Sequence, residues 1–401
     1  MNPETATPRA PGAPAAAARG GRLPDHLIVA AIELVGAWLL AVFLLSRTTW
    51  LIVLVLALFG AALVVMRLRP AIEERIVAAF GRARITALVL GGAIVLAYPF
   101  LLGGNSYAIH ILIIGQLYAV LALALNFQLG SANIPNFATG ASYGIGAYTS
   151  ALLAVTFGVS FWLTLPAAAA VATFFGFVIG FPSMRTRDTY LALVTIAFAV
   201  VVHQLMNNFE WTGGPNGLVG IPAPSLFGHS FNSPIEIFGY RAPGQANFYY
   251  LAVALMVLSI VSARRLHDSR VGLAWNALRE DELAARCQGI NVVWFKMLAF
   301  GVDAFLAAFA GTVYAFYVGY ISPDNFTFLV SVTIMTMVIV GGMDNAFGVI
   351  VGAFLLTMLP EKLRVFNDYR LLFVSALVIL FLILRPQGLF PQRLRVYGGR
   401  K

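Results

Sequence analysis

Few side chains in this sequence have the types and spacing needed for covalent or metal chemistry. Cys287 is the only cysteine, which excludes an internal disulfide and a cysteine-based zinc cluster. The five histidines are scattered and form no HExxH motif. Asp303 and Asp344, the acids that an intramembrane enzyme could pair, lie in no protease-like motif. We therefore expect no catalytic residue and no metal site.

The lysines decide whether this chain could hydrolyse ATP. A phosphate-binding loop needs Gly-Lys followed by Ser or Thr, because that lysine reaches the phosphates. The lysines at 296, 362 and 401 follow Phe, Glu and Arg instead. We therefore expect no cofactor bound by this chain, and any ATP and Mg would be held by a separate polypeptide.

The most patterned polar stretch is LREDELAARCQGIN, residues 278–291, which lies between two apolar segments. A solvated connector is its simplest interpretation, since loops lie on the surface. The stretch is nevertheless rich in helix formers, and its acids come first, where they suit the helix dipole. Gly289 can end such a helix and Asn291 can cap the next one. We predict a short helix over 279–288, outside the membrane, that docks a partner.

The elements that position these residues are long apolar runs. The chain is 60% hydrophobic and 11% charged, whereas soluble domains carry about 25% charged residues. Runs of about 20 apolar residues can span a bilayer as helices. We predict an all-α polytopic transmembrane bundle of ten to twelve spans, some broken or re-entrant. The runs lie near 26–46, 49–66, 85–103, 107–129, 138–158, 161–181, 189–206, 247–263, 295–318, 327–342, 346–360 and 370–384.

The positive charges predict the orientation. With the N-terminus inside, the inside loops are 1–25, 67–84, 182–188, 264–294, 343–345 and 385–401. Of the 26 Lys and Arg, those left outside are Arg47, Arg241, Lys362, Arg364 and Arg370. This bias fits the positive-inside rule, so the basic balance reflects topology rather than nucleic-acid binding. Both termini are then cytoplasmic, with residues 1–24 a disordered tail and 391–401 a basic tail.

Polar residues at membrane depth are candidates for a substrate pathway. The segment 130–137 contains Gly and Pro and predicts a broken or re-entrant helix. An acid at such depth costs at least about 2.5–3.5 kcal/mol unless it is paired or hydrated. The candidates are Asn133, Asn136, Asp303 and Asp344. The asparagines could instead cap helix ends, Asp344 could lie in a solvated turn, and Glu33 could snorkel or contact another subunit.

Small residues four apart allow helices to approach closely. Such pairs occur at Gly140 and Gly144, at Ala307 and Gly311, and at Gly348 and Gly352. We expect them to pack the bundle.

Several stretches resemble one family. Glu282-Leu-Ala-Ala285 followed by Gly289 resembles the EAA coupling loop of ABC-importer permeases, and GLAWNALREDELAARCQGIN resembles the coupling segment of branched-chain amino acid (Liv-type) permeases, larger subunit. Five other stretches agree in order: 126–153, 185–217, 296–315, 341–356 and 368–390. The likeness covers 107–390, and residues 25–106 form N-terminal helices outside its strongest part.

The resemblance implies a transport subunit that is not itself an enzyme. Two cytoplasmic ATPase subunits would grip the coupling residues Arg279, Glu280, Glu282, Ala284, Ala285, Arg286 and Gly289. A second, homologous permease would complete a heterodimer in the lipid of a bacterial inner membrane. A periplasmic binding protein would deliver a branched-chain or other hydrophobic amino acid, moved by alternating access. Close relatives handle urea or short amides.

The sequence departs from the family pattern at several of the candidate residues. Asn133 and Ala138 stand where the family usually has glycine, and Asp303 where it has a small neutral residue. These departures weaken the assignment of an exact substrate. An ion-coupled secondary transporter remains as an alternative, because such proteins also have broken helices and buried acids. It would need no cytoplasmic docking helix, and an inverted repeat, which is not evident by eye, would support it.

Overall fold

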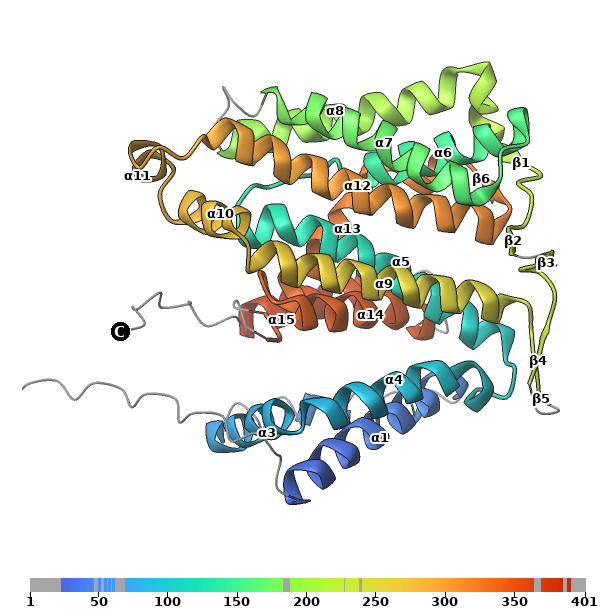
Figure 1. Ribbon diagram of the computed structural model, residues 1–401, viewed down its shortest axis with the longest axis vertical. Helices are drawn as coiled ribbons and strands as arrows, with labels where there is room; N and C mark the ends of the chain where they lie inside the picture. Colours follow the sequence, from blue (N-terminus) through green and yellow to red (C-terminus); the bar gives the residue numbers. More distant parts are fainter. Residues whose placement is uncertain are drawn as a thin grey trace, which may run out of the picture. The chain divides into compact units, whose positions relative to one another are not determined.

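The computed structural model describes residues 23–46, 69–182, 188–226, 228–237, 240–363, 369–384 and 388–390, with 50–51, 54–55, 57–58 and 60–61. Both predicted tails lie outside these residues, apart from 23–24, as does most of the predicted span near 49–66. The chain forms two compact units, Met1–Leu101 and Leu102–Lys401. Each is described by itself (Figure 1).

The first unit contains three described helices of known bounds: α1 (Leu23–Leu45), α3 (Pro70–Arg82) and α4 (Arg84–Leu101). Within the predicted inside connection over 67–84, residues 70–82 form a short helix that is not among the candidate membrane spans. Pro70 starts α3, where its missing N–H is not needed. Ala79 and Ala83 then pack against Val29 of α1. This apolar face holds the segment in a helix.

The second unit is a helical bundle whose centre is α12 (Val292–Val318). It packs against α6 (Thr139–Phe157) and α7 (Phe161–Gly180) on one side and α5 (Ser106–Asn126) on another (Figure 1). The remaining long helices of the unit are α8 (Asp188–Asn208), α9 (Gln245–His267), α13 (Phe328–Gly341), α14 (Ala346–Lys362) and α15 (Arg370–Leu384).

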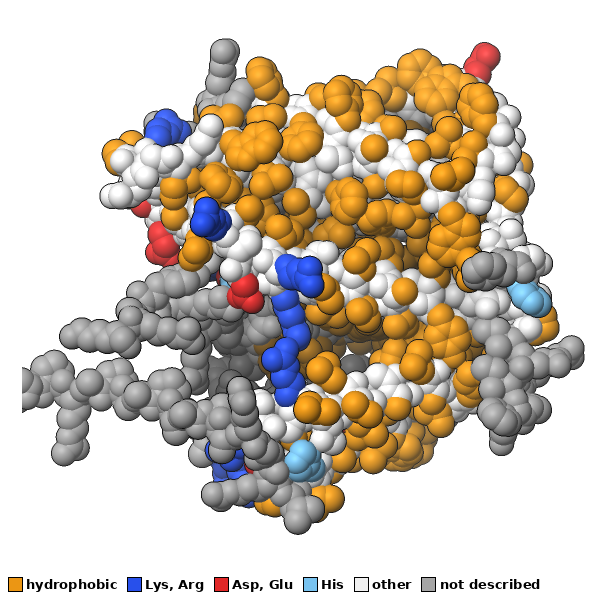
Figure 2. Space-filling view, viewed as in Figure 1, with side chains coloured by type: hydrophobic (Ala, Val, Ile, Leu, Met, Phe, Trp, Pro, Cys, Tyr) orange, Lys and Arg blue, Asp and Glu red, His pale blue; other side chains and the backbone are white. Residues whose placement is uncertain are grey.

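The predicted membrane-spanning helical bundle is confirmed. Among the described residues, eight helices are long and apolar enough to cross a membrane. Apolar side chains cover much of the face seen in Figure 2, whereas charged side chains gather towards the end that carries residues 264–290. The broken helix predicted near 130–137 is present too: α5 runs into a π-helix, η1 (Phe127–Ser131), and α6 begins only at Thr139.

The opposite end of the second unit carries the loop between α8 and α9. It is ordered by the short 3-10 helices η3 (Glu210–Thr212) and η4 (Gly214–Asn216) and by three two-stranded sheets. In these, β1 (Leu218–Val219) pairs with β6 (Tyr320–Ile321), β2 (Ser225–Leu226) with β3 (His229–Ser230), and β4 (Ile235–Ile237) with β5 (Tyr240–Ala242). A further 3-10 helix, η5 (Pro323–Phe326), follows β6. Gly217, at φ 70°, allows β1 to approach Ile321.

Candidate functional site

The polar segment after α9 forms two short helices, α10 (Arg270–Glu280) and α11 (Glu282–Cys287). The single helix predicted over 279–288 is therefore wrong. Asp281 is extended, at φ −158° and ψ 111°, and its carboxylate accepts bonds from the backbone N–H groups of Leu283 (2.8 Å) and Ala284 (2.9 Å). These bonds satisfy the first N–H groups of a new helix, so Asp281 ends α10 and caps α11.

The predicted roles of Gly289 and Asn291, which were to end one helix and to cap the next, are confirmed. Gly289 adopts φ +81°, and its N–H donates to the carbonyl of Arg286 at 3.1 Å. Asn291 then caps α12, since its side chain accepts a bond from the N–H of Trp294 at 3.1 Å. The two caps fix the direction in which the chain returns to the bundle.

The outer face of α11 mixes charge with one large apolar group. Leu283 is 70% exposed. Arg286 and Glu282 form a pair at 3.1 Å, and Glu282 also pairs with Lys296 of α12 at 2.7 Å. Of the seven predicted coupling residues, the exposed ones are Glu280, Ala284, Arg286 and Gly289.

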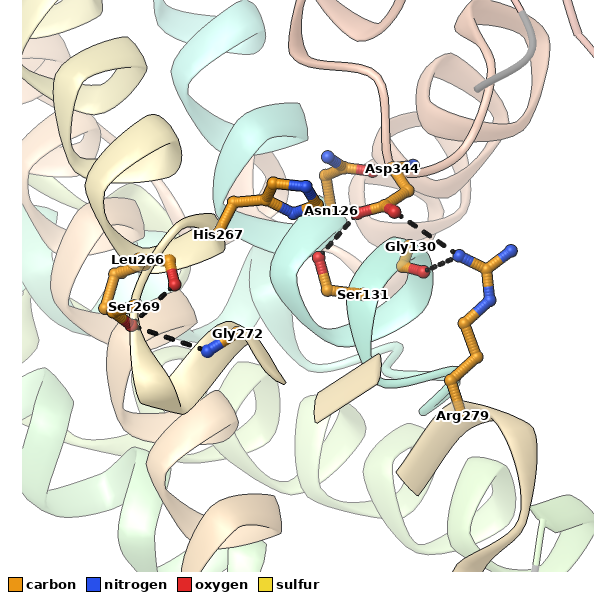
Figure 3. A network of polar contacts seen from close by, with 9 residues as sticks. All are labelled: Asn126, Gly130, Ser131, Leu266, His267, Ser269, Gly272, Arg279 and Asp344. Carbon is orange, nitrogen blue, oxygen red and sulfur yellow. Dashed lines mark hydrogen bonds and ion pairs between the residues drawn. The ribbon is translucent and has the colours of Figure 1, made fainter. Parts of the chain in front are cut away.

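Arg279 behaves differently from its neighbours, because its guanidinium points into the bundle (Figure 3). Its Nη1 donates to the carbonyl of Gly130 at 2.8 Å and lies 3.5 Å from Oδ2 of Asp344. Arg279 therefore joins α10 to the end of η1 and to the turn between α13 and α14. Trp275 holds the same helix from a second side, since its Nε1–H donates to the carbonyl of Phe295 at 2.9 Å.

Asp344 is the centre of this polar network. Ser131 donates its hydroxyl to Oδ1 of Asp344 at 2.7 Å, and Nδ1 of His267 lies 3.7 Å from the same oxygen. The N–H of Asp344 donates to Oδ1 of Asn126 at 2.8 Å. Only 10% of the Asp344 side chain is exposed. The carboxylate is thus paired rather than solvated, and we call these residues with Arg279 and Gly130 the Asp344 network.

A second buried cluster surrounds Asp303, which is 1% exposed in the middle of α12. Asn136 donates from Nδ2 to Oδ2 of Asp303 at 2.9 Å. The hydroxyl of Thr139 lies 3.0 Å from the same oxygen and donates to the carboxylate. Asn136 also accepts a bond from the N–H of Ala138 at 2.8 Å, just before α6. It therefore serves the helix start and the acid together.

The segment that joins the two clusters is irregular. Asn133 is exposed and adopts φ +53°, and the N–H of Ile134 reaches back to the carbonyl of Gln128. Gln128 lies on η1 with no exposed surface, and neither polar atom of its amide has a hydrogen-bond partner in the described part of the chain. An unpaired buried polar group costs about 1–3 kcal/mol. Single-turn π-helices of this kind occur often at functional sites.

The predicted small-residue pairs lie at close helix approaches. A methyl group at Gly311 would collide with the carbonyl of Tyr143 on α6, and one at Gly144 with Phe326 of η5 at 2.9 Å. A methyl group at Gly140 would lie 2.7 Å from Oγ of Ser331, while Gly348 and Gly352 both approach Gly341 of α13. Ala307 is fully buried on α12.

Comparison with known proteins now places this arrangement. The family described as "branched-chain amino acid transport system / permease component" matches residues 107–382, more than half of the chain. The chain belongs to this permease family. It is therefore a permease component, and its transmembrane helices are those of a transport protein.

Three curated relatives are similar to this chain along most of its length. The high-affinity branched-chain amino acid transport system permease protein LivM of Salmonella typhimurium is 41% identical over 311 residues, covering 74% of this chain and 73% of that protein. LivM of Escherichia coli is 41% identical over 308 residues, covering 74% and 72%. LivH of Escherichia coli is 26% identical over 292 residues, covering 69% and 92%. No solved structure matches the chain.

The sequence alone missed several residues of these sites. Asn126, Ser131 and His267 read as ordinary positions in or beside apolar runs, and only their meeting around Asp344 singles them out. Leu283 carried a usable signal, because it is the large apolar residue within a charged segment. Asn136 and Asp303 come together, whereas Asp344 lies in the other network and Asn133 is exposed.

Proposed function

We propose that this permease is the membrane-spanning subunit of an ATP-driven ABC importer for branched-chain or other hydrophobic amino acids. It would receive its substrate from a periplasmic binding protein and release it into the cytoplasm by alternating access. The observation that carries this proposal is the α10–α11 segment. It exposes Leu283 and Arg286 to a soluble partner while Arg279 bonds it to the bundle.

The proposal includes partners that supply what this chain lacks. The sequence has no phosphate-binding loop, so two cytoplasmic ATPase subunits would hold ATP and Mg. A second, homologous permease would complete the pathway as a heterodimer. The likeness to both LivM and LivH supports such a pair. The excess of Lys and Arg on one side supports a bacterial inner-membrane protein with both termini cytoplasmic.

The substrate class rests on the names of the relatives. LivM and LivH are permease proteins of high-affinity branched-chain amino acid transport systems. The chain's departures at Asn133 and Asp303 leave open a more polar substrate such as urea or a short amide. Competition of leucine uptake by valine, urea and acetamide separates these possibilities.

The first test is a pull-down of the tagged chain in mild detergent, followed by mass spectrometry. We expect two ATPase subunits, a second permease and the binding protein. Leu283→Ala combined with Arg286→Ala should remove the ATPase, because both side chains lie on the exposed face of α11. Leu163→Ala is the control, since Leu163 is 66% exposed in the first turn of α7, where the neighbouring Trp162 bonds to Ser225 of the α8–α9 loop.

Other results would point away from an importer. A lone chain or a homo-oligomer without ATPase, in several mild detergents, would contradict the proposal and favour an ion-coupled transporter. Uptake by reconstituted vesicles that needs an ion gradient but no ATP would do the same.

A further inference from the structure

We propose that Arg279 is a positioning residue that transmits movement of the α10–α11 segment to residues 127–138 within the membrane, rather than a contact for the ATPase. This inference rests on the proposed function and deepens it. The sequence placed Arg279 among the coupling residues and Asp344 among the candidates for a substrate pathway. The inference assigns both to one connection between α10 and the membrane-spanning helices.

The first step is the direction of Arg279. Its neighbours Glu280, Asp281 and Leu283 are exposed, but its own guanidinium reaches Gly130 and Asp344. A charge-assisted bond from a planar guanidinium restricts both distance and angle. When α10 moves, the carbonyl of Gly130 and the carboxylate of Asp344 must therefore move with it or lose these bonds.

The second step is the rigidity of the two backbone segments that Arg279 contacts, at Gly130 and Asp344. Asp344 has φ +66°, a conformation that few residues other than Gly, Asn and Asp adopt easily. Its N–H bonds to Asn126 and its carboxylate to Ser131. A methyl group on Gly130 would lie 2.5 Å from the backbone nitrogen of Asp344, so the two backbones are in direct contact. The end of α5 and the α13–α14 turn thus form one body.

The third step leads from this body to the buried acid. Ser131 ends η1, and five residues later Asn136 bonds to Asp303 at 2.9 Å. Three residues before Ser131, on the same π-helix, Gln128 is fully buried, and neither polar atom of its amide has a partner among the described residues. An arrangement that supplied partners to this amide would be favoured over the present one, so residues 127–138 are the two-state element of this proposal. Displacement of α10 would select between the two arrangements.

The test compares variants of the complete complex in proteoliposomes, with leucine uptake and ATP hydrolysis measured on the same preparation. The variants are Arg279→Ala, Arg279→Lys, Asp344→Asn and the double Arg279→Ala with Asp344→Asn. The deciding quantity is leucine moved per ATP hydrolysed, because a merely structural defect lowers both rates without changing their ratio. Asp344→Asn keeps a side chain that tolerates positive φ, so it covers the case in which Arg279→Ala fails to assemble.

We expect the ratio to fall at least tenfold in Arg279→Ala and in Asp344→Asn, with the ATPase still co-purifying. The double variant should have the same ratio as either single variant, since both substitutions remove the same contact between Arg279 and Asp344. Arg279→Lys should be intermediate, because an ammonium group cannot reproduce the guanidinium geometry. Arg286→Ala is the matched control: it should weaken ATPase co-purification but leave the ratio unchanged in the complexes that remain.

Three results would overturn the inference. One is an unchanged ratio in the single variants. Another is additive losses in the double variant. The third is loss of the ATPase in Arg279→Ala but not in Asp344→Asn, which would make Arg279 a docking contact. If the wild-type complex takes up leucine without hydrolysing ATP, the proposed function fails first and this inference falls with it.

Discussion

Asn136 and Asp303 are 167 residues apart in the sequence and meet inside the bundle, with 2.9 Å between Nδ2 and Oδ2. The contact fastens the irregular segment before α6 to the middle of α12. Asp303 has no ion-pair partner within the described part of the chain. A buried carboxylate held only by Asn and Thr donors can hold the segment in place, and it can also serve transport directly.

Asp303→Asn separates these two roles. The new amide replaces one acceptor oxygen by a donor, so one of the two bonds is lost, at a cost of about 1 kcal/mol for a bond between membrane helices. Asn136→Ala removes the same bond from the other side, together with the acceptor of the Ala138 N–H, so its loss of uptake is an upper limit for the fastening role. Equal losses of uptake would mean that Asp303 only fastens the segment. We expect a larger loss for Asp303→Asn, measured as uptake by reconstituted vesicles across a range of pH.

Unchanged uptake, assembly and pH profile in Asp303→Asn would contradict any functional role of the acid. Thermal unfolding in detergent should show a loss of about 1 kcal/mol in Asp303→Asn and a larger loss in Asn136→Ala, because the latter also removes the acceptor of the Ala138 N–H.

Gly146→Ala tests the packing of α6 on α12. Its methyl group would lie 2.7 Å from Cβ and the carbonyl oxygen of Ala308, and backbone atoms cannot move aside cheaply. Overpacking of this kind costs about 1–3 kcal/mol. Gly92→Ala on α4 is the control, because nothing lies within 4 Å of that position. Thermal unfolding should show a clear loss for Gly146→Ala only. Equal stability of the two variants would mean that the helices are farther apart.

Asp281→Ala tests the break between α10 and α11. Loss of the cap leaves the N–H groups of Leu283 and Ala284 without their acceptor, at a cost of about 1 kcal/mol. We expect α11 to fray and ATPase co-purification to fall severalfold, while Asp281→Asn, which can still cap, stays near wild type. If Asp281→Asn were as weak as Asp281→Ala, the charge of Asp281 rather than its cap would be what the ATPase requires.

Cys287 is a built-in probe of orientation, since it is exposed on α11 and is the only cysteine of the chain. A membrane-impermeant maleimide should label it in inside-out vesicles and leave it unlabelled in right-side-out vesicles. Added ATPase subunits should slow the labelling by covering α11. Labelling from the outside would reverse the predicted topology. Cys287→Ser is the control for background reaction.

Much of the fold could be predicted because its signals are local. Lipid requires long apolar helices, and glycines or capping residues mark many of their ends, as Gly289 and Asn291 do. The break at Asp281 could not be predicted in this way. In REDEL an acid suits the first turn of one long helix as well as it suits a cap. Trp275 and Arg279 bond α10 to the bundle and so fix its direction. The chain then changes direction at Asp281, where α11 begins as a separate helix.

The candidate sites depend on tertiary contacts, so the sequence predicted their members better than their grouping. Asp303 and Asn136 were both identified as candidates, because polar groups at membrane depth are costly. Arg279 was assigned to the outer face by its place in a charged segment, and only the structure turns it inward. Gly130 indicated the break after α5, but the π-helix itself gave no signal, since Phe127 to Leu129 match an ordinary continuation of α5.

The tight approach of Gly130 to Asp344 has a consequence for how such permeases can diverge. A methyl group at position 130 would meet both Asn126 and the backbone of residue 344. A descendant that acquires a side chain there must rebuild the α13–α14 turn in the same step, or first lose the bond from residue 126. Positions 126, 130 and 344 should therefore change together across an alignment or stay fixed together, as one heritable unit. Position 133, which is exposed in the same segment, lies outside this group, and its φ of +53° favours Gly, Asn or Asp there.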